Sequence, residues 1–299
     1  MPDRQTVLVT GANGQVGRSI CRAFGDTFNV VGFSSRELDI GEASATHRIF
    51  DNIRPNIVIN AAAFTEVDDA EINSDLAYRT NFFGVKHLCD ACLNHNSLLL
   101  HFSTDYVFDG VATRPYSEKD QTNPLNAYGR SKLLGDQHIN DNADQYLIFR
   151  LAWVYDNAGI NFPNKILQAA KAKDRLTVVD DQIGTPTSAD FIAKTVYQFI
   201  TLEGASDKRR SNNLYNLVPN GEASWFDFAV FLLSRAEALG FDLKCKAEDV
   251  MPIKSSSLIQ AAKRPQNVVL DNRKIQKELG IRFAPWDAYI DDFLGHLGR

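Results

Sequence analysis

A glycine-rich turn near the start of the chain constrains the fold more than any other feature. The β-branched segment Thr6–Thr10 has the continuous apolar character of a short, buried parallel strand. The sequence GANGQVG follows it directly, and a helix pattern then covers Gln15–Phe24. Free N–H groups at the start of such a helix suit a pyrophosphate, so the pattern predicts a Rossmann-like, doubly wound parallel α/β sheet with a dinucleotide site. The predicted cofactor contacts in this turn are Gly11, Asn13, Gly14, Gln15, Val16 and Gly17.

The end of the next predicted strand, Phe28–Phe33, bears on the choice of dinucleotide. An NAD site places a carboxylate here on the ribose 2′-hydroxyl, but the strand is followed by two serines and Arg36. Hydroxyls and a guanidinium suit a 2′-phosphate, which favours NADPH, with NADH as the alternative and an ordinary exposed arginine as the simpler explanation. The predicted cofactor contacts are Ser34, Arg36, and Asp39 and Ile40 at the close of a short third strand.

Small and polar residues follow two further predicted strands. Asn56–Asn60 runs into three alanines, and Leu98–Ser103 runs into Thr104 and Asp105. Ligands of doubly wound sheets lie outside the carboxyl ends of the strands, so both strand ends should face the cofactor and the substrate. The sequence leaves open a supporting role for His101, near the second of these ends. The predicted cofactor contacts are Ala61, Ala62, Ala63, Thr65 and Ser103.

Tyr128 and Lys132 form a candidate proton donor and its modulator. A helix pattern begins near Asn126, and residues four apart on a helix share one face. A neighbouring ammonium favours a phenolate, so it should lower the pKa of the tyrosine from its usual value of about 10. The spacing by itself is more typical of a solvated helix face, and other motifs must decide between the two.

The composition limits the classes of partner. The 299 residues are 44% hydrophobic and 23% charged with a net charge of −5, as in a globular protein without the basic surface that nucleic acid needs. No apolar run reaches the roughly 20 residues of a membrane span and no signal-peptide pattern is present, so we expect a cytoplasmic protein. The CxxC pair of Cys89 and Cys92 has no second pair to complete a metal site and is expected in the core.

Five further motifs extend the pattern through almost the whole chain. They are NAAAFTEVDDAE at 60–71, STDYVFDG at 103–110, NPLNAYGRSK at 123–132, FRLAWVY at 149–155 and DDQIGTPT at 180–187. Together with the glycine turn, they resemble the dTDP-4-dehydrorhamnose reductase family of extended short-chain dehydrogenases. STDYVFDG and DDQIGTPT distinguish that family from the sugar-nucleotide epimerases, to which it is otherwise similar.

The resemblance implies a reaction and a role for several residues. NADPH would reduce the C4 ketone of dTDP-4-dehydro-L-rhamnose to dTDP-L-rhamnose, while Tyr128 protonates the forming alkoxide. Lys132 would hold the nicotinamide ribose and stabilise the phenolate, and Thr104 would hydrogen-bond the reacting oxygen. Arg264 matches an arginine of the family and is a candidate contact for the nucleotide diphosphate. The implied substrate contacts are Thr104, Asp105, Trp153 and Arg264.

The domain organisation follows from the same comparison of motifs. A dinucleotide-binding domain is expected over residues 1–152, with returning segments near 175–220, and a smaller, interleaved α/β substrate-binding domain over 153–299. The polar segment 203–213 is predicted as a surface loop. Two other functions stay open: an NADP-binding regulatory subunit like that of methionine adenosyltransferase, and a sugar-nucleotide epimerase.

A metal ion and a homodimer are the last features that the resemblance raises. Some members of the family dimerise around magnesium held by carboxylates. Asp190 and Asp292 are candidate counterparts of those ligands, but Gln15 stands where a further acid is expected. The sequence therefore leaves Mg²⁺ and the homodimer undecided and assigns no metal ligand.

Overall fold

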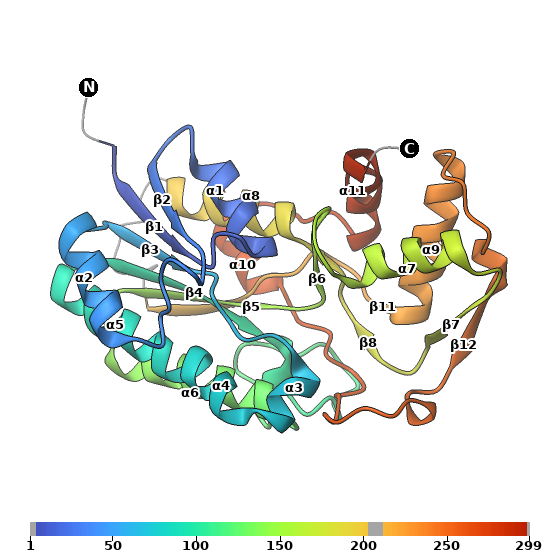
Figure 1. Cartoon of the computed structure of the whole chain (residues 1–299), viewed down its shortest axis with the longest axis horizontal. Helices are drawn as coiled ribbons and strands as arrows, with labels where there is room; N and C mark the ends of the chain where they lie inside the picture. Colours follow the sequence, from blue (N-terminus) through green and yellow to red (C-terminus); the bar gives the residue numbers. More distant parts are fainter. Residues whose placement is uncertain (1–3, 203–211, 298–299) are drawn as a thin grey trace.

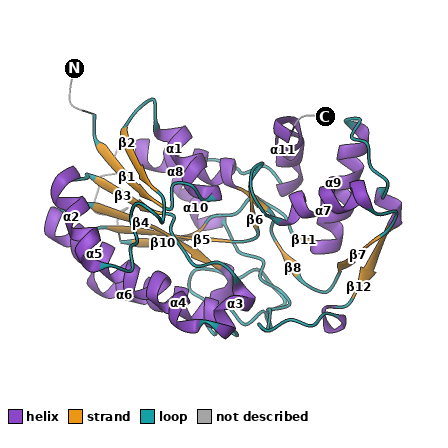
Figure 2. Ribbon diagram, viewed as in Figure 1, coloured by secondary structure: helices purple, strands orange, loops and turns teal. Residues whose placement is uncertain are grey.

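A parallel sheet forms the larger part of the computed structural model, which describes residues 4–202 and 212–297. The sheet has six strands in the order β10-β5-β4-β3-β1-β2, and all neighbouring strands are parallel (Figures 1 and 2). The chain runs from β1 to β2 on one side and then returns to β3 on the other. This reversal is the switch point at which doubly wound sheets bind ligands. The strands are β1 (Thr6–Thr10), β2 (Asn29–Phe33), β3 (Ile57–Asn60), β4 (Leu98–Thr104), β5 (Tyr146–Leu151) and β10 (Asn213–Asn216).

Helices cover both faces of the sheet, which confirms the predicted fold class. The side chains of β1 alternate between the faces: Val7 and Val9 pack against α1, α8 and α10, whereas Leu8 packs against α2, α5 and α6. We call this sheet with its covering helices the sheet lobe. Within the described part of the chain, no helix combines the length and apolar character needed to cross a membrane. The helices are α1 (Gln15–Phe24), α2 (Ala43–Ile53), α5 (Val85–His95), α6 (Ala127–Asn142), α8 (Ala189–Thr201) and α10 (Arg273–Leu279).

A second lobe lies beyond the end of β5 (Figure 1). Its own apolar core includes Leu167 of α7, Phe228 of α9 and Phe293 of α11. The short strand β7 pairs in parallel with β12, and β8 pairs antiparallel with β11. The elements are β6 (Val154–Tyr155), α7 (Phe162–Ala172), β7 (Leu176–Val179), β8 (Ile183–Gly184), β9 (Thr187–Ser188), β11 (Ala223–Ser224), α9 (Trp225–Ala238), β12 (Val250–Ile253) and α11 (Ile290–Leu297).

Two predicted elements differ from the structure. The third strand expected at Asp39 and Ile40 is wrong: these residues lie in a turn before α2, where Arg79 binds the Asp39 carboxylate at 2.7 Å. The sequence of residues 74–95 predicts one continuous helix, but the structure has α4 (Ser74–Tyr78), a π-helical segment (Arg79–Gly84) and α5 in succession between α3 (Val67–Ile72) and β4. The loop predicted at 203–213 lies outside the described residues except for its last two.

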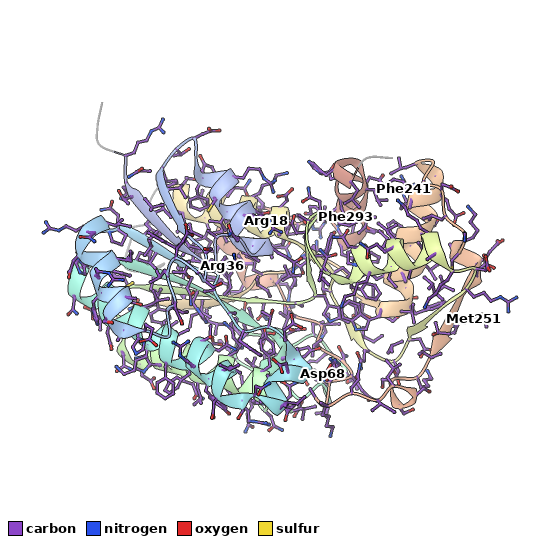
Figure 3. All side chains as sticks on the ribbon, in the orientation of Figure 1. Arg18, Arg36, Asp68, Phe241, Met251 and Phe293 are labelled. Atoms are coloured by element: carbon purple, nitrogen blue, oxygen red, sulfur yellow. The ribbon has the colours of Figure 1, made fainter. Side chains whose placement is uncertain are left out.

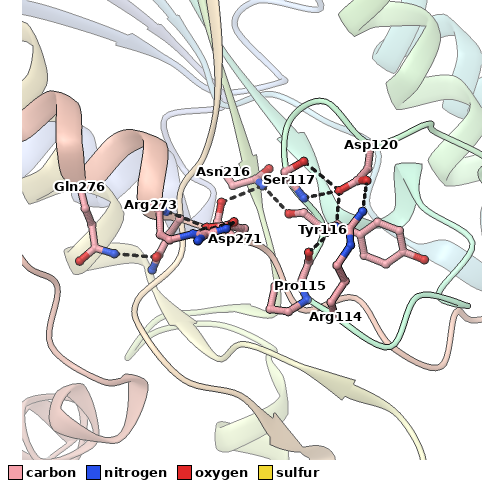
Figure 4. A network of polar contacts seen from close by, with 10 residues as sticks. Arg114, Pro115, Tyr116, Ser117, Asp120, Asn216, Asp271, Arg273 and Gln276 are labelled. Carbon is pink, nitrogen blue, oxygen red and sulfur yellow. Dashed lines mark hydrogen bonds and ion pairs between the residues drawn. The ribbon is translucent and has the colours of Figure 1, made fainter.

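A polar network fixes the long loop between β4 and α6 to the edge of the sheet (Figure 4). Asn216, at the end of β10, donates its side-chain N–H groups to the carbonyl oxygens of Tyr116 (2.8 Å) and Asp271 (3.1 Å). Within the loop, Arg114 pairs with Asp120 at 2.6 Å. The segment that leads into α6 is therefore anchored before the helix begins.

Candidate active site

A cavity of about 950 Å³ opens along the carboxyl ends of the strands, between the two lobes. Its walls come from the glycine turn, the ends of β3, β4 and β5, and the starts of α6, α7 and α9. The sequence-predicted residues that line it are Gly14, Gln15, Val16, Ala61, Ala62, Ala63, Thr65, Ser103, Thr104, Asp105, Tyr128, Lys132 and Trp153. Those that do not line it are Gly11, Asn13, Gly17, Ser34, Arg36, Asp39, Ile40 and Arg264.

The glycine turn is as tight as the sequence predicts. Gly11 has φ +65°, and a Cβ atom there would lie 2.7 Å from the backbone of Ala61. A Cβ atom on Gly17 would lie 2.2 Å from the carbonyl oxygen of Gly11. Gly11 and Gly17 therefore allow close packing of the backbone within the turn and do not line the cavity, whereas Gly14, at the start of α1, does.

The turn after β2 contains a carboxylate that the sequence reasoning missed. Glu37 accepts hydrogen bonds from the Ser34 hydroxyl at 2.7 Å and from the Ser34 N–H at 2.8 Å. These bonds lower the pKa of Glu37. Arg36 is exposed in the same turn (Figure 3). The Ser-x-x-Glu spacing, typical of a reciprocal turn contact, is the sequence signal for this arrangement.

Tyr128 and Thr104 meet because α6 begins close to the end of β4. Asn126 caps α6 by accepting a hydrogen bond from the Gly129 N–H at 2.8 Å. A Cβ atom on Gly129 would lie 2.2 Å from the carbonyl oxygen of Tyr106, so only glycine permits this approach. Burial raises the pKa of the Tyr128 phenol above its ordinary value, while a hydrogen bond with the Thr104 side chain opposes that rise. The phenol therefore stays protonated at neutral pH, as a proton donor requires.

Lys132 is buried, and its side-chain nitrogen contacts a backbone carbonyl oxygen and a histidine. Its Nζ atom donates to the Phe102 carbonyl oxygen at 2.6 Å and lies 3.1 Å from Nε2 of His101. Burial lowers the pKa of Lys132 to about 8, although the nearby Asp136 carboxylate raises it. The predicted lowering of the Tyr128 pKa by this ammonium is wrong, because burial, Asp105 and Asp136 raise that pKa instead.

Asp105 carries an unpaired polar atom into the cavity wall. Its Oδ1 atom accepts a hydrogen bond from the Thr104 hydroxyl at 2.9 Å, whereas Oδ2 is buried and has no hydrogen-bond partner in the part of the chain that the structure describes. Burial raises the pKa of this carboxyl group to about 7. A buried oxygen without a partner suits a hydroxyl group of a ligand.

Trp153 is held in place by a second tryptophan that the sequence reasoning missed. The ring centroids of Trp153 and Trp225 are 3.5 Å apart and the rings are inclined by only 5°. Trp153 adopts φ +43°, an uncommon left-handed conformation for a residue with a large side chain. A Cβ atom on Gly184 would lie 2.4 Å from the Trp153 indole, so β8 packs directly against it. Both rings line the cavity as one aromatic wall.

Arg264 lies outside the cavity and is already paired. Its guanidinium forms two hydrogen bonds with the Asp68 carboxylate, at 2.6 and 3.1 Å. This pairing lowers the pKa of Asp68 to about 2. Asp68, which Figure 3 marks in the sheet lobe, thus joins α3 to the segment that contains Arg264. Asp68 is a further residue that the sequence reasoning missed.

The candidate magnesium ligands Asp190 and Asp292 lie in α8 and α11, respectively. Asp190 accepts hydrogen bonds from Arg22 (2.7 Å) and Ser19 (3.1 Å), so its charge is already compensated. Gln15 is a neutral amide whose oxygen accepts from Asn161 at 3.2 Å. Among the described residues, no group of three His, Cys, Asp or Glu side chains could hold a metal ion.

The parallel sheet, the glycine turn and a Tyr-x-x-x-Lys helix that faces the cavity define a short-chain dehydrogenase of the extended class. Comparison with known proteins narrows this class. The chain belongs to the family described as "RmlD substrate binding domain", whose model matches residues 5–298.

Individual relatives agree with this family. The chain is 37% identical over 288 residues to the dTDP-4-dehydrorhamnose reductase of Aggregatibacter actinomycetemcomitans, covering 95% of this chain and 96% of the relative. The dTDP-4-dehydrorhamnose reductase of Bacillus anthracis, solved in complex with NADP, superposes with a TM-score of 0.89 at 29% identity, covering 98% of this chain and 99% of that one. The enzyme of Clostridium acetobutylicum gives a TM-score of 0.89 at 34% identity, covering 99% and 100%.

Proposed function

We propose that the protein reduces the C4 ketone of dTDP-4-dehydro-L-rhamnose with NADPH to form dTDP-L-rhamnose. One observation carries this proposal: Tyr128, Thr104 and Lys132 line a single cavity beside the glycine turn. The names of the relatives support the sugar substrate, and the NADP complex of one relative supports the cofactor. The reaction belongs to the biosynthesis of nucleotide sugars for polysaccharides. A homodimer and a cytoplasmic location stay predictions.

The chain supplies the proton and the binding groups. Bound NADPH supplies the hydride for the ketone carbon. Tyr128 donates its phenolic proton to the ketone oxygen, and a protonated Lys132 stabilises the resulting phenolate. The Thr104 hydroxyl turns from Asp105 toward the same oxygen and donates a second hydrogen bond. These donors act together where negative charge develops.

The two lobes divide the ligands between them in this proposal. The glycine turn, the alanines after β3 and Ser103 hold the cofactor against the sheet lobe, within residues 1–152. Trp153 and the second lobe, mainly residues 153–299, hold the sugar nucleotide, with Asp105 as a hydroxyl acceptor. Arg264 reaches the diphosphate only if that anion competes successfully with Asp68.

A substrate panel tests this function. Purified protein is incubated with several dTDP-4-keto-6-deoxysugars and with NADPH or NADH, oxidation of the cofactor is followed by absorbance, and the products are identified by NMR. We expect NADPH oxidation with formation of dTDP-L-rhamnose. A regulatory subunit would bind NADPH without turnover, and an epimerase would retain NAD and leave NADPH unconsumed; either result would contradict the proposal.

Replacing Thr104 with valine should slow turnover while cofactor binding persists. Valine keeps the shape of threonine but removes the hydroxyl donor, and loss of one such donor typically lowers kcat about 100-fold. Steady-state kinetics and an NADPH titration measure the two effects. Thr195→Val is the matched control, since Thr195 is buried in α8 and bonds only the Phe191 carbonyl oxygen there. Equal kcat in both variants would exclude Thr104 from the reaction.

Replacing Arg36 with alanine should weaken NADPH binding and leave NADH binding unchanged. An exposed charge-assisted contact with the 2′-phosphate is worth about 1.4 kcal/mol, so the Kd for NADPH should rise about tenfold. Fluorescence titration with both cofactors measures this difference. Arg48→Ala removes another exposed arginine, on α2, and should change neither Kd. An unchanged NADPH affinity in Arg36→Ala would assign the 2′-phosphate to other groups.

A further inference from the structure

A chain of buried polar side chains crosses the sheet beneath Lys132. Thr10 of β1 lies opposite Asn60 of β3, and Asn60 lies opposite His101 of β4 in the strand register. The Thr10 hydroxyl lies 2.7 Å from Oδ1 of Asn60, and Nδ2 of Asn60 lies 2.9 Å from Nδ1 of His101. Nε2 of His101 then lies 3.1 Å from Nζ of Lys132. All four residues are essentially inaccessible to solvent.

The direction of each hydrogen bond in this chain can be worked out. The backbone N–H of Ala62 can only donate, and it contacts Oδ1 of Asn60 at 3.2 Å. This contact fixes the amide oxygen on that side, so the Thr10 hydroxyl also donates to it. The amide nitrogen must then donate to Nδ1 of His101. A neutral imidazole that accepts at Nδ1 carries its proton on Nε2.

Among the described residues, Nε2 of His101 has one hydrogen-bond partner. Oδ1 of Asp136 lies 3.7 Å away, too far for a hydrogen bond, whereas Nζ of Lys132 lies 3.1 Å away. An ammonium group has only donors, so it cannot accept this hydrogen bond. A neutral amine can: its lone pair faces His101, and one of its N–H groups donates to Phe102 at 2.6 Å.

We propose that the Thr10–Asn60–His101 chain positions Lys132 and favours its neutral form by presenting an N–H donor to Nζ. These hydrogen-bonded side chains thereby set the pH above which Lys132 loses its positive charge. Binding of the cofactor ribose and stabilisation of the Tyr128 phenolate both require that charge. This inference rests on the proposed function for the role of Lys132, and it adds Asn60 and His101 as positioning residues.

The surrounding charges act in both directions. The Asp136 carboxylate, which lies 4.0 Å from Nε of Arg150, favours the ammonium form of Lys132. Tyr128 and Asp105 lie toward the cavity. Burial lowers the pKa of Lys132 to about 8, and burial together with the Lys132 charge holds the pKa of His101 well below its usual range. A neutral His101 with one N–H is therefore the expected form at neutral pH.

Two variants test the direction of the hydrogen bonds between Asn60, His101 and Lys132. In Asn60→Asp, the carboxylate accepts a hydrogen bond from the Nδ1–H of a neutral His101, so the unprotonated Nε2 becomes an acceptor for the ammonium. In His101→Gln, the amide can turn its oxygen toward Nζ without adding a charge. We expect both to move the titration of Lys132 upward by about one pH unit. His87→Gln is the control, because His87 on α5 bonds the Ile40 carbonyl oxygen and does not contact Lys132.

The measured quantity is the Kd for NADPH, determined by fluorescence from pH 7 to 10. This range lies above the pKa of a phosphate monoester, about 6, so the charge of the NADPH 2′-phosphate stays constant. The wild-type protein should lose affinity above about pH 8, and both variants should retain it to higher pH. If only Asn60→Asp shifts the pH at which NADPH affinity is lost, the shift is an effect of the added charge and the proposal is wrong. If Asn60→Asp does not fold, His101→Gln decides alone, and an unchanged pH dependence in that variant would overturn the proposal. Sugar turnover is not needed for this readout, so absence of reductase activity would refute the proposed function separately.

Discussion

Tyr128→Phe should lower kcat by about 100- to 10,000-fold, the usual contribution of a positioned general acid, while NADPH binding changes little. The variant removes one oxygen atom and retains the ring that packs edge-to-face against Tyr106, with centroids 5.8 Å apart. The raised pKa of Tyr128 keeps the wild-type phenol protonated through neutral pH, so this loss should not depend on pH between about 6 and 8. Steady-state kinetics across that range and an NADPH titration measure both quantities.

The matched control for this variant is Tyr146→Phe. Tyr146 begins β5, and its hydroxyl donates to Asn140 at 2.8 Å, away from the cavity. Its loss should cost about 1 kcal/mol of unfolding free energy and leave kcat unchanged. If Tyr128→Phe retained more than about a tenth of the wild-type kcat, the proton would have to come from another group, and the proposed acid would be wrong.

Gly17→Ala should weaken both the fold and cofactor binding. The added methyl group would lie 2.2 Å from the Gly11 oxygen and 2.9 Å from the Ala12 Cα atom, both in the backbone of the turn. A backbone contact cannot rotate away as a side chain can, so α1 must move off β1. We expect a loss of about 1–3 kcal/mol in unfolding free energy, as for other overpacked sites, and at least a tenfold weaker affinity for NADPH.

Gly295→Ala provides a control of opposite sign. Gly295 lies in α11, and among the described residues no heavy atom beyond its chain neighbours and the helix's own backbone would lie within 4 Å of an added Cβ, so alanine should stabilise the protein by about 0.5–1 kcal/mol. Urea unfolding and NADPH titration of both variants measure the contrast. If the Gly17→Ala and Gly295→Ala variants had the same unfolding free energy, the glycine turn would accommodate a methyl group at residue 17, and a glycine would not be required there.

The parts of the site that the sequence predicts are those set by local pattern. Strand, glycine turn and helix are adjacent in sequence, so Gly14, Gln15 and Val16 reach the cavity as expected. Tyr128 and Lys132 share one helix face for the same local reason, and both line the cavity. The resemblance to a known family then supplies the chemistry that spacing alone leaves undecided.

The parts that were missed or wrong depend on contacts between distant segments. Arg264 pairs with Asp68, 196 residues away in the chain, and no local sequence pattern predicts such a pair. Asp39 does not form the predicted strand, and its carboxylate instead binds Arg79, which lies 40 residues further along the chain. The pKa of Tyr128 rises because tertiary burial outweighs the expected influence of the lysine, and burial cannot be read from a spacing of four residues.

The alternation of the two cores along the chain limits how this protein can exchange parts with its relatives. Residues 191–200, 215–217 and 275–283 return to the core of the sheet lobe, whereas residues 223–250 and 286–294 return to that of the second lobe. A single genetic crossover therefore cannot transfer one lobe intact, because every junction after β5 divides at least one core between the parents. New sugar specificity in this architecture has to arise by point substitution or by replacement of several segments at once.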